Sequence, residues 1–321
     1  MRRRTLLASV LAAAGAAGLA ACGADDTSGA SGASGGAASD GGASGGGVLD
    51  TVTVKGAFGA EPTVTFDAPL SFSAPEAKII TPGDGEAIAE GDALGMHTAY
   101  IDATSGEVLQ SSWQGAPAEF LAVSVESNGQ EAVSFLTTAT VGSRIAMLGQ
   151  VTDSQGKSYQ VVQVSDIVSK ALPRATGTPQ PIPADQPQFT LAENGAPQLS
   201  GTPTTPAPST TVATVTIQGE GEQTAEGDTL AMHYTGWKLS DGSQFDSSWD
   251  RGEPFSFTLG QNQVIQGWDV PLTGKTVGSQ VLLVIPPAEA YGEAGQSQSE
   301  LAGETLIFVA DILGAVKAPA A

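Results

Sequence analysis

Short runs in which apolar and polar residues alternate follow one another along most of the chain from residue 48 onward. A period of two is typical of half-buried strands, because successive side chains of a strand point to opposite faces of a sheet. No long helical period appears, so the pattern predicts a protein built mainly from strands. The expected strands are 48–56, 63–66, 71–74, 78–82, 93–102, 132–136, 144–150 and 160–168, then 212–218, 229–239, 255–259, 279–285 and 305–313.

Two stretches interrupt this pattern. Residues 22–47 are mostly Gly, Ala, Ser and Asp, so they cannot bury enough apolar surface to offset the entropy of the free chain. Residues 171–186 are rich in proline, and that composition favours an extended, semi-rigid conformation. We therefore expect a disordered tether at 22–47 and a Pro-rich linker at 171–186, which separate two domains at 48–170 and 187–317.

The two expected domains share one sequence pattern. Residues 81–113 match residues 217–249 without a gap, at a constant offset of 136 positions. The match resumes near the end of each domain, where residues 164–167 correspond to residues 309–312. Glycines recur at the same places in both copies and set the turns, because positions with φ > 0 favour glycine. The repeat predicts one fold used twice.

The first 22 residues have the layout of a secretion signal. Arg2, Arg3 and Arg4 precede an apolar run that is shorter than the ~20 residues of a membrane span. The residues that follow, LAAC, resemble the bacterial lipobox, which implies cleavage after residue 21 and lipidation of Cys22. An ordinary signal peptide cut near the alanines is the alternative, and both the Sec and the twin-arginine routes stay open. We expect an exported protein, lipid-anchored to the outer face of the cytoplasmic membrane.

The chain is strongly acidic. It carries 13 basic and 34 acidic side chains, a formal net charge of −21. Such a surface repels phosphate backbones, so nucleic acid is not an expected partner. The one cysteine, Cys22, excludes an intramolecular disulfide. His97 and His233 occupy the same position in the two copies without a second His or Cys nearby, so we expect structural hydrogen bonds there and no metal site.

Aromatic side chains of the second copy gather between His233 and Trp268, among a few polar groups that include Asp246 and Arg251. This is the composition of a small apolar pocket. An ordinary core explains the same cluster, because large apolar residues are usually inside. By themselves, Asp246 and Arg251 favour a simple surface ion pair worth ~0–1 kcal/mol. The aromatic residues are Tyr234, Trp237, Phe245, Trp249, Phe255, Phe257 and Trp268.

Four segments of the second copy stand out over about residues 212–316: HYTGWKLSDGSQFDSS with DRGEPF, FTLGQNQVIQGWD, VGSQVLLVIPPAEAYG and TLIFVADIL. In sequence and in order, these segments resemble the FKBP family of peptidyl-prolyl cis-trans isomerases. The resemblance implies an α+β fold in which a twisted antiparallel sheet wraps around a short helix, here present twice. We expect the helix of the second copy at 264–272, where the apolar residues share a helical face.

The resemblance also implies a proline-binding pocket whose floor is Trp268. A dry aromatic pocket favours the twisted imide over the planar one, so neither a cofactor nor a metal is expected. The implied partners are proline-containing exported polypeptides and FKBP-type macrocyclic inhibitors, besides the membrane bound through the lipid. The implied catalytic residues are Asp246, Tyr291, Tyr234 and Trp268, and the substrate-binding residues are Phe245, Arg251, Phe255, Val264, Ile265 and Phe308.

Two departures qualify the resemblance. The flap that follows Tyr291 is polar, with Gln296, Ser299 and Glu300 near positions where the family carries a histidine and an apolar tip. In the first copy the pocket residues are replaced, for example Trp268 by Ala132. We therefore expect a degenerate first copy without isomerase activity, which serves as a spacer, a client-binding surface or a dimerisation unit. A proline-binding chaperone without catalysis and a purely structural envelope lipoprotein are the competing functions.

Overall fold

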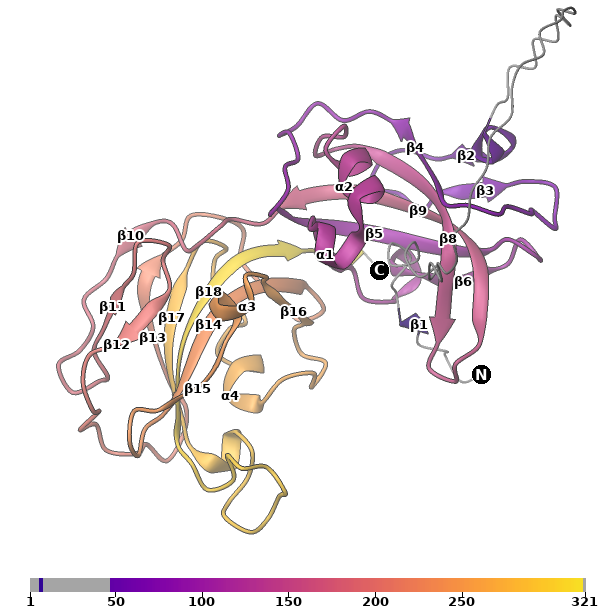
Figure 1. Cartoon of the computed structure of the whole chain (residues 1–321). Coiled ribbons are helices and arrows are strands. Elements are labelled where there is room, and N and C mark those ends of the chain that lie inside the picture. The colour runs from indigo at the N-terminus through magenta and orange to yellow at the C-terminus, as the bar shows by residue number, and fades with distance from the viewer. Residues whose placement is uncertain (1–5, 8–46, 320–321) are drawn as a thin grey trace, which may run out of the picture.

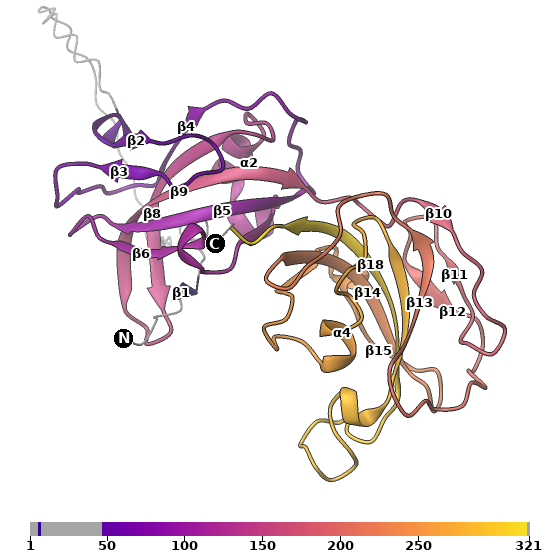
Figure 2. The same ribbon diagram turned by 180° about the vertical axis from the view of Figure 1, so that it is seen from behind.

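The computed structural model describes residues 6–7 and 47–319 (Figure 1). Two domains built on antiparallel sheets lie side by side (Figure 1, Figure 2). The structure does not describe most of the predicted signal and tether, nor Cys22. The exceptions are residue 47 and the strand β1 (Leu6–Leu7), which pairs with Thr152 and Asp153 of the first sheet. Within the described part of the chain, no helix is both long and apolar enough to cross a membrane.

The first sheet is antiparallel throughout, and β9 lies at its centre between β8 and β5. Along the sheet the order is β8-β9-β5-β6, with β4 beside β8 and β7 beside the other half of β5. The strands are β4 (Glu76–Thr81), β5 (Ala93–Asp102), β6 (Val108–Ser111), β7 (Glu119–Ala122), β8 (Arg144–Asp153) and β9 (Ser158–Lys170).

Six strands of the second sheet repeat six strands of the first. Its order is β10-β13-β17-β18-β14-β15, with β16 beside β14, so β13 to β18 have the neighbours of β4 to β9, and β10 is an addition at the edge. The expected α+β fold of antiparallel sheets with few helices is confirmed. The strands are β10 (Thr178–Pro179), β13 (Val212–Gln218), β14 (Thr229–Lys238), β15 (Gln244–Ser247), β16 (Phe255–Thr258), β17 (Gln280–Ile285) and β18 (Leu306–Val316).

The helices are short, and two expectations about them were wrong in detail. Residues 132–136, expected as a strand, belong to a helix, because Val133 and Leu136 bury one helical face against the sheet. Five residues are too few to separate the two periods. The helix expected at 264–272 spans only four residues. The helices are α1 (Val125–Asn128), α2 (Gln130–Leu136), α3 (Ser248–Arg251) and α4 (Gln266–Asp269), and the 3-10 helices are Val48–Thr51, Ser112–Gln114 and Pro287–Glu289.

Both faces of each sheet are covered by apolar side chains. On one face of the second sheet, Trp268 and Leu272 from α4 and the turn after it pack on the strands. The opposite face is covered by Phe189 and Leu199 from a small hairpin, β11 (Phe189–Leu191) and β12 (Pro197–Leu199). A second hairpin, β2 (Thr53–Lys55) and β3 (Thr63–Thr65), covers the first sheet in the same way. Residues 71–74, expected as a strand, belong to no strand.

The Pro-rich segment 171–186 is hydrogen-bonded along the second sheet. The amide of Ala175 donates to Asp311 Oδ2 at 2.8 Å, and the amide of Gln180 donates to the carbonyl of Thr216 at 2.8 Å. Between them, β10 pairs with β13 as an edge strand. An edge is the place where a strand tolerates proline, because one side of it makes no ladder bonds.

A buried ion pair ties the loop between β2 and β3 to the first sheet. Arg144 Nε donates to Asp166 Oδ1 at 2.6 Å, and the two side chains are 1% and 0% exposed. The guanidinium also donates to the carbonyls of Gly56, Ala57 and Ala60. All the hydrogen-bonding capacity of the pair is thus directed at the sheet and at this loop.

Candidate functional site

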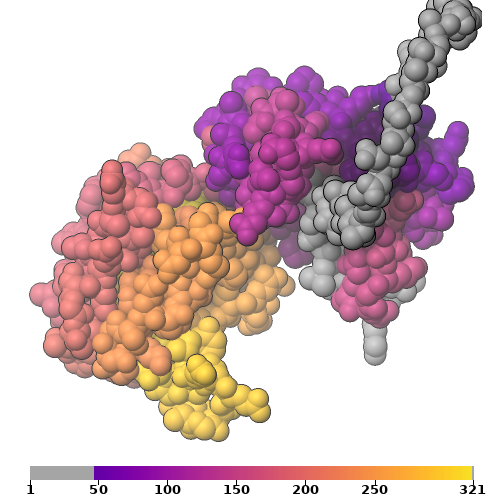
Figure 3. Space-filling view, in the orientation of Figure 1, coloured from indigo at the N-terminus to yellow at the C-terminus, as the bar shows by residue number. Residues whose placement is uncertain are grey.

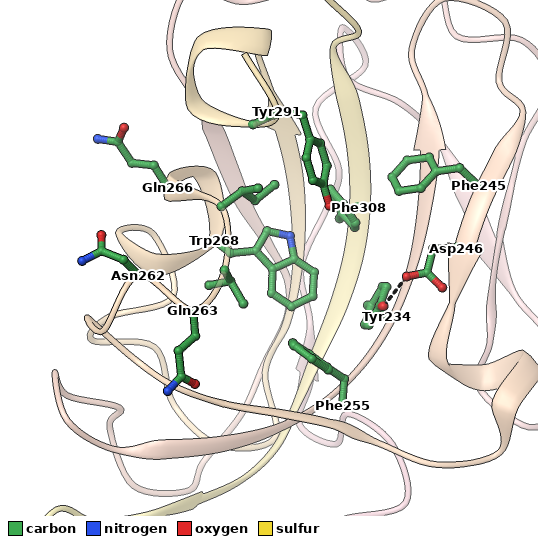
Figure 4. A pocket seen from close by; sticks show the side chains of 13 residues that line it. Tyr234, Phe245, Asp246, Phe255, Asn262, Gln263, Gln266, Trp268, Tyr291 and Phe308 are labelled. Atoms are coloured by element: carbon green, nitrogen blue, oxygen red, sulfur yellow. Dashed lines mark hydrogen bonds between the residues drawn. The ribbon is translucent and has the colours of Figure 1, made fainter. Parts of the chain in front are cut away.

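An aromatic cavity of about 520 Å³ lies between the second sheet and α4 (Figure 4). Its volume falls in the range of small-molecule and peptide sites. Aromatic side chains form its base, and carboxamide, hydroxyl and carboxylate groups lie around its mouth. The lining residues are Tyr234, Phe245, Asp246, Phe255, Asn262, Gln263, Val264, Ile265, Gln266, Trp268, Ala290, Tyr291 and Phe308.

Trp268 forms the base of this cavity. Its indole meets Tyr234 edge-to-face with ring centroids 5.1 Å apart and Phe308 in the same way at 5.2 Å. These edge-to-face contacts fix the plane of the indole. The residue is 4% exposed, and its Nε1 has no hydrogen-bond partner among the described residues. The tryptophan therefore offers a rigid apolar surface with one unused donor.

A glycine in β14 makes room for the rings. A Cβ atom on Gly236 would lie 2.7 Å from Phe245 Cζ and 2.8 Å from Phe308 Cε1, closer than carbon atoms can approach. The two rings meet edge-to-face at 5.5 Å and form one wall of the cavity. Any side chain at position 236 would displace that wall.

Three polar side chains form a closed network at the mouth. The Tyr234 hydroxyl donates to Asp246 Oδ2, Arg251 Nη1 donates to Asp246 Oδ1 at 2.5 Å, and Arg251 Nη2 donates to the Tyr234 hydroxyl at 3.0 Å. Partial burial opposes ionisation of Asp246, but the bonds from Tyr234 and Arg251 outweigh it and hold the pKa of its carboxyl below the usual value. Asp246 is therefore an oriented anion at neutral pH.

The two tyrosines of the cavity stay protonated. Burial, reinforced by the hydrogen bond to Asp246, raises the pKa of Tyr234 to about 12. Burial and the charge of Asp246 raise the pKa of Tyr291 as well. Figure 4 shows the Tyr291 hydroxyl pointing into the cavity, where it can donate to a ligand carbonyl. Ile265 precedes α4 with an extended backbone (φ −62°, ψ 149°) and lies at the cavity wall.

The segment after Tyr291 forms the flap. It closes on itself through the amide of Gly303, which donates to the carbonyl of Gly292 at 2.8 Å. Leu301 packs against the apolar core, whereas Gln296 and Glu300 are exposed. The flap thus presents a polar surface beside the cavity.

Nine of the ten predicted pocket residues line the cavity. The exception is Arg251, which reaches it only through Asp246 and Tyr234. Four further lining residues were not predicted from the sequence: Asn262, Gln263, Gln266 and Ala290. Three of them are polar and therefore did not count as members of an aromatic cluster, although they flank Val264, Ile265 and Trp268 in the chain. Cys22, the predicted lipidation site, lies outside the described residues.

In the first copy the equivalent space is filled. Tyr100 takes the place of Gly236, since it pairs with Gln110 and Gln163 as Gly236 pairs with Asp246 and Phe308. Its ring is 2% exposed, and its hydroxyl donates to Glu119 Oε1 at 3.0 Å. A large side chain therefore stands in the first copy where the second has a glycine with the rings of Phe245 and Phe308 packed against it.

The Glu119 carboxyl gives the first domain a distinctive pH dependence. Burial raises the pKa of Glu119 to about 7, against the effect of the Tyr100 hydrogen bond. A raised pKa means that the folded state holds this proton more tightly than the unfolded state. The free energy of unfolding should therefore decrease as the pH rises from 4.5 to 7. The full loss, on the order of 3 kcal/mol, persists above pH 7.

Glu119→Gln is accordingly expected to stabilise the first domain at pH 8 and to leave it nearly unchanged at pH 4.5. Glutamine keeps the acceptor for Tyr100 and removes the ionisation. Thermal melts of both proteins at the two pH values test this. Equal shifts at pH 8 and pH 4.5 would contradict it.

The two histidines are structural, as expected. His233 Nδ1 lies 2.9 Å from Ser248 Oγ, and His97 Nδ1 lies 3.0 Å from Ser112 Oγ. Burial, with the nearby Arg251 charge, lowers the pKa of His233 to about 4, so it is neutral. Among the described residues no group of three or more His, Cys, Asp or Glu is placed to hold a metal ion.

An antiparallel sheet around a short helix, with an aromatic cavity and an oriented carboxylate at its mouth, defines the second domain as an α+β domain with an apolar pocket. Residues 220–313 match the family model of the FKBP-type peptidyl-prolyl cis-trans isomerases. The chain is 42% identical over 113 residues to a probable FK506-binding protein of Corynebacterium glutamicum. This match covers 35% of the present chain and 93% of the relative. The chain belongs to the FKBP-type peptidyl-prolyl cis-trans isomerase family.

Other relatives extend beyond the match. FK506-binding protein 2B of Rhizopus delemar is 54% identical over 87 residues, which is 27% of this chain and 42% of that protein. The match to the solved structure of FkpA from Escherichia coli covers 41% of this chain and 53% of that one, at 33% identity and a TM-score of 0.31. The isomerase domain is the C-terminal one, and the first copy lies outside the family match.

Proposed function

We propose that the protein is a peptidyl-prolyl cis-trans isomerase whose second domain carries the activity. The observation that carries the proposal is the aromatic cavity with Trp268 at its base and ionised Asp246 at its mouth. It has the size and polarity to bury a proline ring while the chain on either side remains in solvent.

The reaction needs no bond to be made or broken. An X-Pro amide rotates over a barrier of ~18–20 kcal/mol that comes from amide resonance. Twisting the bond removes the resonance and makes the imide less polar than the planar ground state. A dry aromatic cavity therefore binds the twisted form better, which lowers the barrier. The protonated Tyr291 hydroxyl is placed to donate to a substrate carbonyl during the rotation. The Asp246 carboxylate faces the carbonyl of the X-Pro amide as that amide rotates.

A protease-coupled assay on a proline peptide tests the proposal. The wild-type chain should accelerate isomerisation, and Asp246→Ala and Tyr234→Phe should each lower kcat/KM about tenfold, which corresponds to ~1.4 kcal/mol of transition-state stabilisation. Equal rates for wild type and both variants would rule out this mechanism. An FKBP-type macrocyclic inhibitor should compete with the peptide.

A second candidate function is a proline-segment-binding chaperone or assembly module without turnover. The polar flap, with Gln296 and Glu300 exposed, favours it, because the rim then offers little apolar surface to close over a substrate. Binding of the peptide without acceleration would support this alternative.

We further propose that the protein assists the folding of exported, proline-containing polypeptides from the outer face of the cytoplasmic membrane. The basic N-terminus, the short apolar run and the LAAC sequence support export and lipidation at Cys22. Acyl chains would anchor the isomerase at the membrane, where exported polypeptides emerge. The acidic surface would not bind nucleic acid.

Cys22→Ser is expected to abolish the anchor. The variant should either accumulate with its signal uncleaved or appear in the medium, because serine has no thiol for lipidation. Fractionation of cells into membrane and medium, with the mass of the released N-terminus, provides the measurement. Membrane retention and processing equal to those of the wild type would argue against lipidation.

A further inference from the structure

The first domain contacts the loop that carries pocket residues of the second. We call residues 252–255 the pocket loop. It follows Arg251 and ends at Phe255, so it joins the charged network to a cavity wall. Ser124 Oγ donates to Glu253 Oε1 at 3.1 Å, and Ser127 Oγ donates to the same oxygen at 2.9 Å. One carboxylate oxygen in the middle of the pocket loop therefore accepts two hydroxyl donors from the other domain.

One of the two donors, Ser124, is held in place by α1. Ser124 is the N-cap of α1, and its Oγ accepts the amide of Ser127 at 3.1 Å. The amide of Ser124 donates to Asn128 Oδ1 at 3.1 Å, and Asn128 is only 5% exposed. The Ser124 hydroxyl therefore accepts a bond inside α1 and gives its single proton to Glu253. Ser127 lies in the same short helix and donates to the same carboxylate oxygen.

This contact uses the part of the first copy that corresponds to the rim of the cavity. At the constant offset of the repeat, Ser127 corresponds to Gln263 and Asn128 to Val264, and both of the latter line the cavity of the second copy. In the first copy the same segment forms α1 and binds the neighbouring domain. The rim has thus been replaced by a docking element.

The surrounding interface limits movement between the domains. Thr229 Oγ1 donates to the carbonyl of Ala118 at 3.3 Å. Phe120 lies so close to β18 that a Cβ atom on Gly314 would be 3.0 Å from its ring. The end of β18 runs up to the first domain (Figure 2), and Figure 3 shows the two bodies in contact beside α1. Because the domains touch around them, the hydrogen bonds from Ser124 and Ser127 to Glu253 fix the pocket loop relative to the first domain.

We propose that Ser124 and Ser127 are positioning residues for the isomerase site, which act through Glu253 to hold Arg251 and Phe255 in the conformation that binds substrate. The inference rests on the proposed isomerase function and gives the first copy a role in it. Loss of the two hydroxyls frees the pocket loop, and the cavity wall and the charged network then sample other positions. A misplaced binding group lowers the rate even when it is far from the reacting bond.

A double-mutant cycle in the full chain tests the proposal. Ser124→Ala with Ser127→Ala should lower kcat/KM about fivefold, chiefly through KM, because a binding wall loosens. In a Glu253→Ala background the same two changes should have no further effect. Glu253→Gln keeps an acceptor oxygen and should retain most of the wild-type rate. The matched control is Ser105→Ala with Ser158→Ala, two exposed serines of the first domain with bonds only inside it, which should leave the rate unchanged.

Amide exchange separates this inference from the function. Exchange at Gly252, Glu253 and Phe255 should accelerate in the serine variant and not in the control. An unchanged rate in the serine variant, or a loss that persists in the Glu253→Ala background, overturns the proposal. If the wild-type chain shows no isomerase activity, the proposed function fails, and unchanged exchange in the pocket loop would then overturn the positioning role independently.

Discussion

Replacing Trp268 with alanine is expected to lower kcat/KM for X-Pro isomerisation by about thirtyfold. The indole is the base on which a proline ring would lie, and it is held by edge-to-face contacts with Tyr234 and Phe308. A substrate ring that loses this surface forfeits ~2 kcal/mol of apolar contact, and 1.36 kcal/mol corresponds to a factor of about ten. The protease-coupled assay measures the change.

Loss of a buried tryptophan also destabilises a domain, by ~3–5 kcal/mol, so the result needs controls. Trp249→Ala removes a tryptophan of the same domain that stacks on His233 at 4.1 Å and does not line the cavity. It should reduce stability but keep kcat/KM within about twofold of the wild type. Trp268→Phe keeps an aromatic base and removes an indole N–H that has no partner among the described residues. Retained activity in Trp268→Ala, once its fold is verified by near-UV circular dichroism, would remove the tryptophan from the mechanism.

Asp166→Asn is expected to destabilise the first domain by ~3–5 kcal/mol, because it leaves the charge of Arg144 buried without a counter-ion. The guanidinium is 1% exposed, and its remaining partners are neutral carbonyls of the loop between β2 and β3. That loop should loosen at the same time, since its Gly59 amide donates to Asp166 Oδ2 at 2.7 Å. Differential scanning calorimetry of the full chain should show the first-domain transition at a lower temperature.

The second copy offers the matched control for this prediction. Asp311 occupies the place of Asp166, but its partners are the neutral Gln280 and the amide of Ala175. Burial raises the pKa of Asp311 to about 6, so the folded domain already holds this charge less favourably than solvent does. Asp311→Asn leaves no charge stranded and should cost less than Asp166→Asn. Equal losses at the two sites would show that burial of Arg144 is not the cause.

Local sequence patterns predicted much of the fold because they report on single elements. Period-two alternation and short apolar runs found most of the strands, because a strand shows one or the other according to whether one face or both are buried. It failed at 132–136, where a seven-residue helix buries Val133 and Leu136 and offers too few residues to reveal a helical period. The aromatic composition marked the cavity but missed Asn262 and Gln263, whose polar side chains line it only because the backbone turns there.

The repeat in the sequence predicted that both copies share a fold, and the strand order confirms that they do. A comparison of pocket residues indicated that the first copy had lost the aromatic lining. It did not reveal that the Tyr100 ring is buried and bonded to Glu119 where the second copy packs Phe245 and Phe308 against Gly236, because that requires knowing which residues face each other across three strands. Whether one side chain fills the space of another depends on which residues pack together, and sequence periodicity does not report this.

The sequence by itself determined the strands, the duplication, the aromatic cluster and the predicted export signal, because each depends on residues close together in the chain or on a copied order. Only the tertiary structure decided how distant residues meet. It brought Arg144 within hydrogen-bonding distance of Asp166 and three loop carbonyls. It did the same for Tyr100 and Glu119, and for the two serines of the α1 segment and Glu253. Hydrogen bonds and buried charges act over a few ångströms, and the fold alone brings residues separated by more than a hundred positions, such as Ser124 and Glu253, to that distance.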